Sequence, residues 1–140
     1  MEKVSISGQI RKMSALYAQK ILVQKTREVS LLGKKCKPTI IYTFLGFELQ
    51  TNSKRITCPD MSTARYLKIF SELGMPSIRI PYDPTQTSLY LTKMENYLKK
   101  IKELLLEEKL TKSKHQTKLR RIYGKIRDHL HQAEQNIVSM

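Results

Sequence analysis

Basic side chains recur at three- and four-residue steps near the C-terminus of the chain. The members of this basic stripe are Lys114, Lys118, Arg121 and Lys125. Residues at this spacing share one face of a helix, so on a helix they would form a continuous row. A row of cations on a rigid rod can neutralise several phosphates together and release counterions, the main term in sequence-independent nucleic-acid binding. The spacing predicts phosphate contacts, although such a row can also serve only to keep a helix surface soluble.

Other cations extend the predicted contact set. They belong to the same C-terminal segment, to the connection before Pro38 and to the N-terminal segment: Arg120, Arg127, Lys34, Lys35, Lys37, Arg11 and Lys12. Lysines in a loop can grip phosphates or can simply be solvated, and the sequence leaves both readings open. We rank Arg11 and Lys12 as secondary contacts.

Aromatic rings beside cations would favour single-stranded nucleic acid, because bases stack on exposed rings. Tyr123 lies among the C-terminal arginines and is the first candidate, followed by Tyr82 and Tyr90. The remaining tyrosines of interest lie on apolar stripes and are assigned to the core: Tyr17, Tyr42 and Tyr66.

Histidines and cysteines do not form a recognisable metal or catalytic site. His129 and His131 are two positions apart, so on a helix they diverge instead of chelating one ion. Cys36 and Cys58 form no CxxC pair, and they indicate two reduced thiols rather than a disulfide framework. The five glycines are scattered singly, which excludes a Gly-rich phosphate loop. We predict no bound metal and no cofactor.

Carboxylates are relevant because basic proteins that bind nucleic acid can also cleave it. The segment Glu48-Leu49-Gln50 lies at the end of a predicted strand, and Asp60 follows the next one. The order of elements is similar to the core of PD-(D/E)xK nucleases, which need Glu-x-Lys to hold Mg²⁺ and position a water. Here Gln50 stands where that lysine belongs, and the context of Asp60 is typical of a helix cap. A Mg²⁺-dependent or degenerate nuclease is therefore kept only as an alternative to a protein that is not an enzyme.

The elements that must position these residues begin with a helix expected from about Ser5 to Ser30, with Ser5 or Ser7 as its cap. Thr39 to Gln50 is rich in β-branched and aromatic residues and predicts a strand that is covered on both faces, with Gly46 as a possible dividing point. A turn and a short strand, Arg55 to Cys58, complete a hairpin.

The second half of the chain is predicted to contain three helices and one short strand. Asp60 is expected to cap a helix that ends near Gly74, and a short strand over residues 77–81 follows. The order strand, helix, strand predicts a right-handed parallel crossover. Two apolar seams then predict an antiparallel pair of helices: Leu91, Met94, Leu98, Ile101 and Leu105 in the first, and Leu119, Ile122, Ile126, Ala133 and Ile137 in the second.

The chain is strongly basic. Lysine and arginine outnumber aspartate and glutamate 26 to 12, a net charge of +14. Residues 1–38 hold nine basic and two acidic side chains and residues 111–140 hold seven and two, so the excess lies at both ends. Such a chain repels itself unless an anionic partner screens it, and nucleic acid is the commonest partner. No membrane span or secretion signal is evident, which favours a cytoplasmic, intracellular protein.

We therefore expect a single α/β (α+β) domain over residues 1–140, with a small three-stranded mixed sheet, flanking helices and a C-terminal antiparallel helical hairpin over residues 84–140. Its expected function is non-catalytic binding of DNA or RNA phosphates through basic helix and loop surfaces. The alternative from another class is an accessory subunit that docks a protein partner through the helical hairpin.

Overall fold

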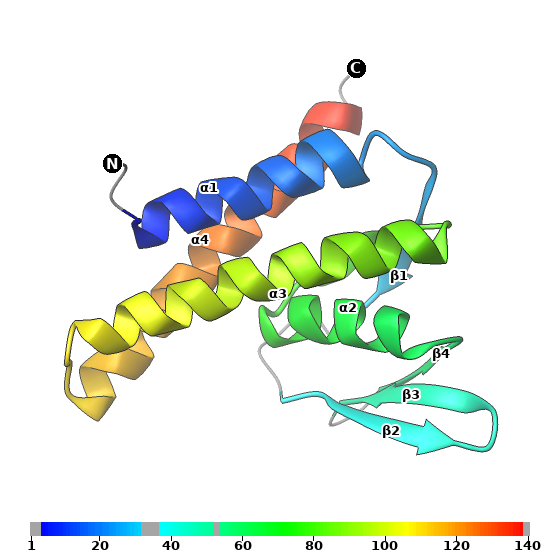
Figure 1. Cartoon of the computed structure of the whole chain (residues 1–140), viewed down its shortest axis with the longest axis horizontal. Helices are drawn as coiled ribbons and strands as arrows, with labels where there is room; N and C mark the ends of the chain where they lie inside the picture. Colours follow the sequence, from blue (N-terminus) through cyan, green and yellow to red (C-terminus); the bar gives the residue numbers. More distant parts are fainter. Residues whose placement is uncertain (1–3, 32–36, 52–53, 139–140) are drawn as a thin grey trace. The chain divides into compact units, whose positions relative to one another are not determined.

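The computed structural model describes residues 4–31, 37–51 and 54–138. Helices form both ends of the chain, and the strands lie in its middle part (Figure 1). In order they are α1 (Ile6–Leu16), a π-helical turn η1 (Tyr17–Ile21), β1 (Thr26–Ser30), β2 (Thr39–Thr43), β3 (Gly46–Gln50), β4 (Arg55–Cys58), α2 (Met61–Glu72), β5 (Ser77–Pro81), α3 (Pro84–Glu107) and α4 (Lys112–Val138). The expected α+β class is confirmed. The chain divides into two compact units, residues 1–23 with 93–140 and residues 24–92.

The first unit is helical. Ser5 caps α1, since its hydroxyl accepts a hydrogen bond from the Gly8 N–H at 3.0 Å. The predicted apolar face of this helix is buried, including Met13, Tyr17 and Ile21. The Tyr17 hydroxyl donates to the carboxylate of Glu134, which ties the π-helical turn to α4.

The helix predicted to reach Ser30 ends at Ile21 instead. Residues Thr26–Ser30 form β1, which pairs antiparallel with β5, so that Val29 lies opposite Ile78. This part of the prediction was wrong because the partner strand is about fifty residues away in sequence. A non-local pairing of this kind outweighs the local helical pattern.

The predicted helical hairpin is visible in Figure 1, where α4 turns back after α3. All five residues of the first seam are buried, and Ile122, Ile126 and Ala133 of the second seam are buried as well. Lys109 has a left-handed backbone, with φ 52°, and so reverses the chain direction after α3. A partner helix could reach these seams only if the buried side chains were first exposed.

The second unit contains both sheets. One sheet has the order β2-β3-β4 and the other has the order β1-β5, and every pairing is antiparallel. The mixed sheet and the parallel crossover were therefore wrong, because β5 pairs with β1 and not with the hairpin strands. Gly46 does divide the long strand: at φ +123° it begins β3, and an added Cβ there would lie 3.3 Å from the Cys58 carbonyl oxygen.

The helix α2 packs against the three-stranded sheet. Asp60 caps it as predicted, since its Oδ1 accepts from the Thr63 N–H at 2.7 Å. The rings of Tyr66 and Phe70 are fully buried, with centroids 4.9 Å apart. The Tyr66 hydroxyl also donates to the Arg79 carbonyl oxygen at 2.7 Å, which joins α2 to β5.

Candidate nucleic-acid interface

The basic stripe lies on the N-terminal half of α4. Lys114, Arg121 and Lys125 are exposed and Lys118 is half-buried. At about 1.5 Å rise per residue, the eleven-residue step from first to last member spans about 16 Å. One strand of B-DNA advances about 3.4 Å per phosphate, so this length matches about five phosphates. The sequence prediction that these four side chains share a face agrees with their positions on one continuous helix.

A shallow hollow of about 280 Å³ borders the stripe. Its lining combines three stripe cations with hydroxyl and apolar groups: Lys114, Lys118, Arg121, Ser113, Thr117 and Leu110. Cations position a phosphate by charge, and hydroxyl groups can add hydrogen bonds to its oxygens. However, the Thr117 hydroxyl already donates to the Ser113 carbonyl oxygen at 3.0 Å, so it offers mainly its acceptor side.

The N-terminus of α4 carries charges of the unfavourable sign. Thr111 caps the first turn, since its Oγ1 accepts from the Lys114 N–H at 3.3 Å and its carbonyl oxygen accepts from the His115 N–H at 2.8 Å. The first turn contains no acidic residue, and Lys112 and Lys114 stand there instead. The helix dipole favours anions at this end, so these lysines cost stability that a bound phosphate would restore.

Lys118 differs from the other members of the stripe because it forms an ion pair with Glu108 across the turn between α3 and α4. The two side chains are 39% and 34% exposed, so the pair is hydrated and contributes little to stability. A phosphate approaching the stripe therefore competes with Glu108 for the same ammonium group.

The structure does not bring the other α4 arginines into the stripe. At about 100° per residue, Arg120 and Arg127 lie roughly 140° around the helix from it. Arg120 is exposed and Arg127 is half-buried, with a guanidinium nitrogen 3.4 Å from where a Cβ on Gly124 would lie. These two residues share a second face of α4, separate from the stripe.

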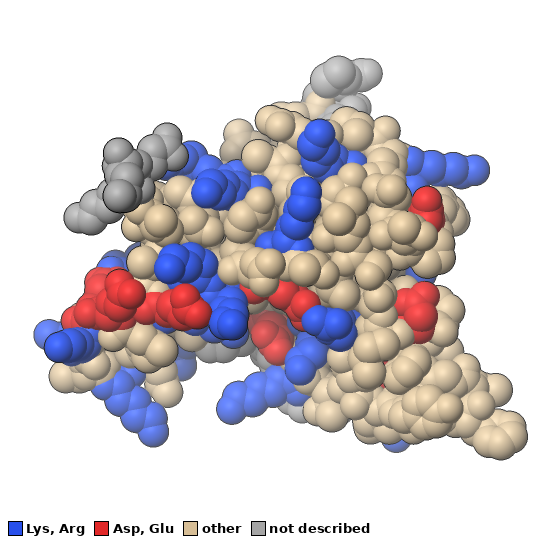
Figure 2. Space-filling model, in the orientation of Figure 1, with Lys and Arg blue, Asp and Glu red and all other residues tan. Residues whose placement is uncertain are grey.

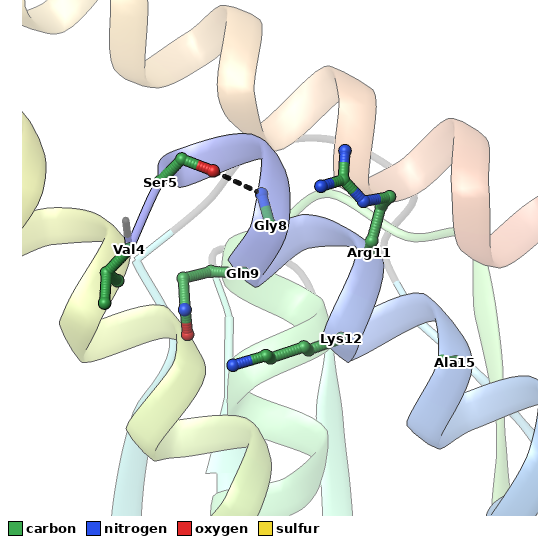
Figure 3. A pocket seen from close by; sticks show the side chains of 7 residues that line it. All are labelled: Val4, Ser5, Gly8, Gln9, Arg11, Lys12 and Ala15. Carbon is green, nitrogen blue, oxygen red and sulfur yellow. Dashed lines mark hydrogen bonds between the residues drawn. The ribbon is translucent and has the colours of Figure 1, made fainter. Parts of the chain in front are cut away.

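Arg11 and Lys12 line a separate hollow of about 480 Å³ along α1. In Figure 3 the Lys12 side chain extends beside that of Gln9, whereas Arg11 extends in a different direction, towards α4. The two cations therefore do not converge on one point.

Of the predicted loop lysines, Lys34 and Lys35 lie outside the described residues. Lys37 is exposed just before β2. On the face drawn in Figure 2, Lys and Arg side chains are scattered and Asp and Glu side chains lie among them, so no single basic area covers that face. This face of the molecule is therefore not uniformly positive.

The aromatic predictions were partly wrong. Tyr123 and Tyr90 are each only 7% exposed, so they cannot stack on bases. Tyr82 is exposed, and the Lys25 ammonium lies 5.5 Å from the centre of its ring. Tyr42, assigned to the core, is 79% exposed instead. Helical spacing placed Tyr123 beside arginines, but the same turn of α4 also carries the buried residues Ile122 and Ile126.

The groups weighed for catalysis have structural partners. Glu48 accepts a hydrogen bond from Gln50 at 2.7 Å and lies 3.7 Å from the Arg55 guanidinium, while Asp60 caps α2. Burial raises the pKa of the Cys58 thiol, with a smaller opposing effect from its hydrogen bond to the Leu49 backbone. Within the described ranges, no three His, Cys, Asp or Glu side chains gather in a way that could hold a metal ion.

No family model, curated protein or solved structure matches the chain. Among the described helices, none is both long enough and apolar enough to cross a membrane.

Proposed function

We propose that this protein binds DNA or RNA through phosphate contacts along the basic stripe of α4, without catalysis. The observation that carries the proposal is a row of four cations, three of which line a hollow, near a helix end whose dipole also favours anions. Contacts of this kind fix a phosphate chain in place but carry no sequence information. Binding is therefore expected to be largely independent of base sequence.

Secondary contacts would come from cations outside the stripe. Arg120 and Arg127 on the second face of α4 could meet a neighbouring strand, and Lys37, Arg11 and Lys12 would add weaker attraction. A nucleic-acid partner also implies an intracellular, cytoplasmic location. Glu48 and Asp60 take no catalytic part in this proposal, since each already has a structural partner.

A salt titration of binding tests this function. Single-stranded DNA, duplex DNA and structured RNA would each be titrated at several salt concentrations and the affinity plotted as log K against log salt. Phosphate binding predicts a straight line of negative slope, about 0.9 per phosphate neutralised on duplex DNA and about 0.7 on a single strand. Absence of binding to all three polymers at low salt would refute the proposal, as would an affinity that does not change with salt.

A further inference from the structure

The β2–β3 hairpin exposes large apolar side chains. Tyr42 is 79% exposed, Phe44 103% and Leu45 83%. Figure 1 shows the turn of this hairpin reaching past α2, which packs on the same sheet. A cluster of exposed apolar side chains on one element usually marks a contact surface.

The strand β2 carries no blocking residue on its outer edge. In the sheet order β2-β3-β4, β2 is an edge strand, and among the described residues no strand pairs with its outer side. Natural edge strands are normally blocked by lysine, by proline within the strand or by a bulge. The strand Thr39–Thr43 contains no charged residue and no proline, and its five residues pair with β3 without interruption. Its backbone is therefore able to accept another strand.

The sequence of β2 is complementary to itself. Written Thr-Ile-Ile-Tyr-Thr, it is nearly palindromic about Ile41. In an antiparallel pairing centred there, Ile41 meets its own copy, Ile40 meets Tyr42 and Thr39 meets Thr43. Aromatic with β-branched pairs and Thr with Thr pairs are among the cross-strand combinations that stabilise sheets.

We propose that β2 pairs antiparallel with β2 of a second copy of this chain, with a two-fold axis at Ile41. The result is one six-stranded antiparallel sheet, in which each Tyr42 packs beside Ile40 of the other copy. A two-fold interface of this type is isologous, so the chain closes as a dimer and does not form a fibre.

The helices leave room for this pairing. In each copy α2 lies mainly against β3. The two β3 strands would be three strand spacings apart, about 14 Å, whereas packed helices need only about 8–10 Å between axes. The register places Tyr42, Phe47 and Cys58 opposite one another, so Tyr42 projects on the same side of the sheet as buried Cys58. Its ring can therefore fill the space beside α2.

Local charge also permits the contact. Two molecules of net charge +14 repel each other. Between Thr39 and Gln50, however, the hairpin contains no cation and a single carboxylate, that of Glu48. Because salt screens the remaining repulsion, self-association should strengthen as salt rises, the opposite of the salt effect expected for nucleic-acid binding.

The test compares two single substitutions by sedimentation equilibrium over a range of protein and salt concentrations. Ile41→Lys places two like charges opposite each other on the two-fold axis and is expected to weaken dimerisation at least about tenfold. Thr57→Lys is the matched control, because Thr57 is exposed on the other edge strand and projects on the same side of the sheet as Ile41. A wild-type protein that stays monomeric at all concentrations refutes the proposal, and so does equal weakening by both substitutions.

A second variant guards against loss of folding in Ile41→Lys. Cα atoms of directly opposed residues in an antiparallel pair are about 4.5–5.5 Å apart, within the range that a disulfide spans. Ile41→Cys should therefore form a covalent dimer under mild oxidation. Thr57→Cys has the same native thiols but places its new thiol on the other edge strand, so it should not form a covalent dimer. Covalent dimer formed to the same extent in both variants contradicts the pairing.

Discussion

Neutralising the basic stripe is the perturbation that separates a specific site from the general effect of net charge. In the stripe variant, Lys114, Lys118, Arg121 and Lys125 are all changed to Gln. Removing lysine from the first turn of α4 also removes an unfavourable interaction with the helix dipole. The variant should therefore keep the melting temperature of the wild type.

The expected change can be worked from the contacts. If all four cations meet phosphates of duplex DNA, the slope of log K against log salt falls by about 3.6; if Lys118 stays paired with Glu108, it falls by about 2.7. Over a fourfold rise in salt, the wild type should then lose about 40-fold to 150-fold more affinity than the variant. Fluorescence anisotropy with a labelled duplex measures both slopes.

The matched control removes four positive charges from α3. Lys93, Lys99 and Lys102 are exposed, and Lys100 lies 3.9 Å from Glu103, as Lys118 is paired with Glu108 in the stripe. Changing these four lysines to Gln gives the same net charge as the stripe variant. If both variants lose the same slope, binding depends on overall charge and the stripe is not the site.

Three further predictions concern single residues. Glu108→Gln releases Lys118 from its ion pair and should raise nucleic-acid affinity severalfold at low salt in the same anisotropy assay; unchanged affinity would mean that Lys118 meets no phosphate. Asp60→Ala removes the carboxylate that caps the Thr63 N–H, so it should lower the free energy of unfolding by about 1 kcal/mol in urea denaturation. Asp60→Asn keeps a side-chain oxygen at this position and should retain most of that stability. Burial raises the pKa of the Cys58 thiol above its ordinary value of 9.0. The folded protein therefore keeps its full stability below pH 9.0 and loses part of it as the pH rises through the folded-state pKa of this thiol. Urea denaturation at pH 8 and 10 should show a larger loss for the wild type than for Cys58→Val, and equal losses would contradict the assignment.

Local features of the fold could be predicted from the sequence. The caps at Ser5 and Asp60 were predicted because each depends on one side chain and an N–H three positions later. The seam of α3 was predicted because its heptad-like spacing repeats over four turns. Features of this kind are determined within a few residues of the chain.

Pairings between distant segments could not be predicted in the same way. The sequence extends the first predicted helix over the residues of β1 because no proline interrupts the chain there. Only the pairing of Val29 with Ile78 makes this segment a strand. Tyr42 was placed in the core because the hairpin is apolar on both sides, yet it is largely exposed. The burial of a strand depends on which elements pack against it, and the sequence of the strand alone does not determine those elements.

In the candidate site too, local features could be predicted from the sequence and contacts between distant residues could not. The stripe was predicted as one row because helical spacing alone determines it. The ion pair of Lys118 was not predicted, since Glu108 reaches it only through the turn at Lys109. The burial of Tyr123 was also missed, because it depends on how α4 packs against its neighbours.

Protection of lysines from acetylation, read by mass spectrometry, tests the central claim most directly. The protein would be acetylated briefly with and without a saturating single strand or duplex, at low salt. Phosphates lying along α4 should slow the acetylation of Lys114, Lys118 and Lys125 severalfold while leaving Lys93 and Lys99 on α3 unchanged. Equal protection of both sets, or protection of the α3 lysines alone, would contradict the account.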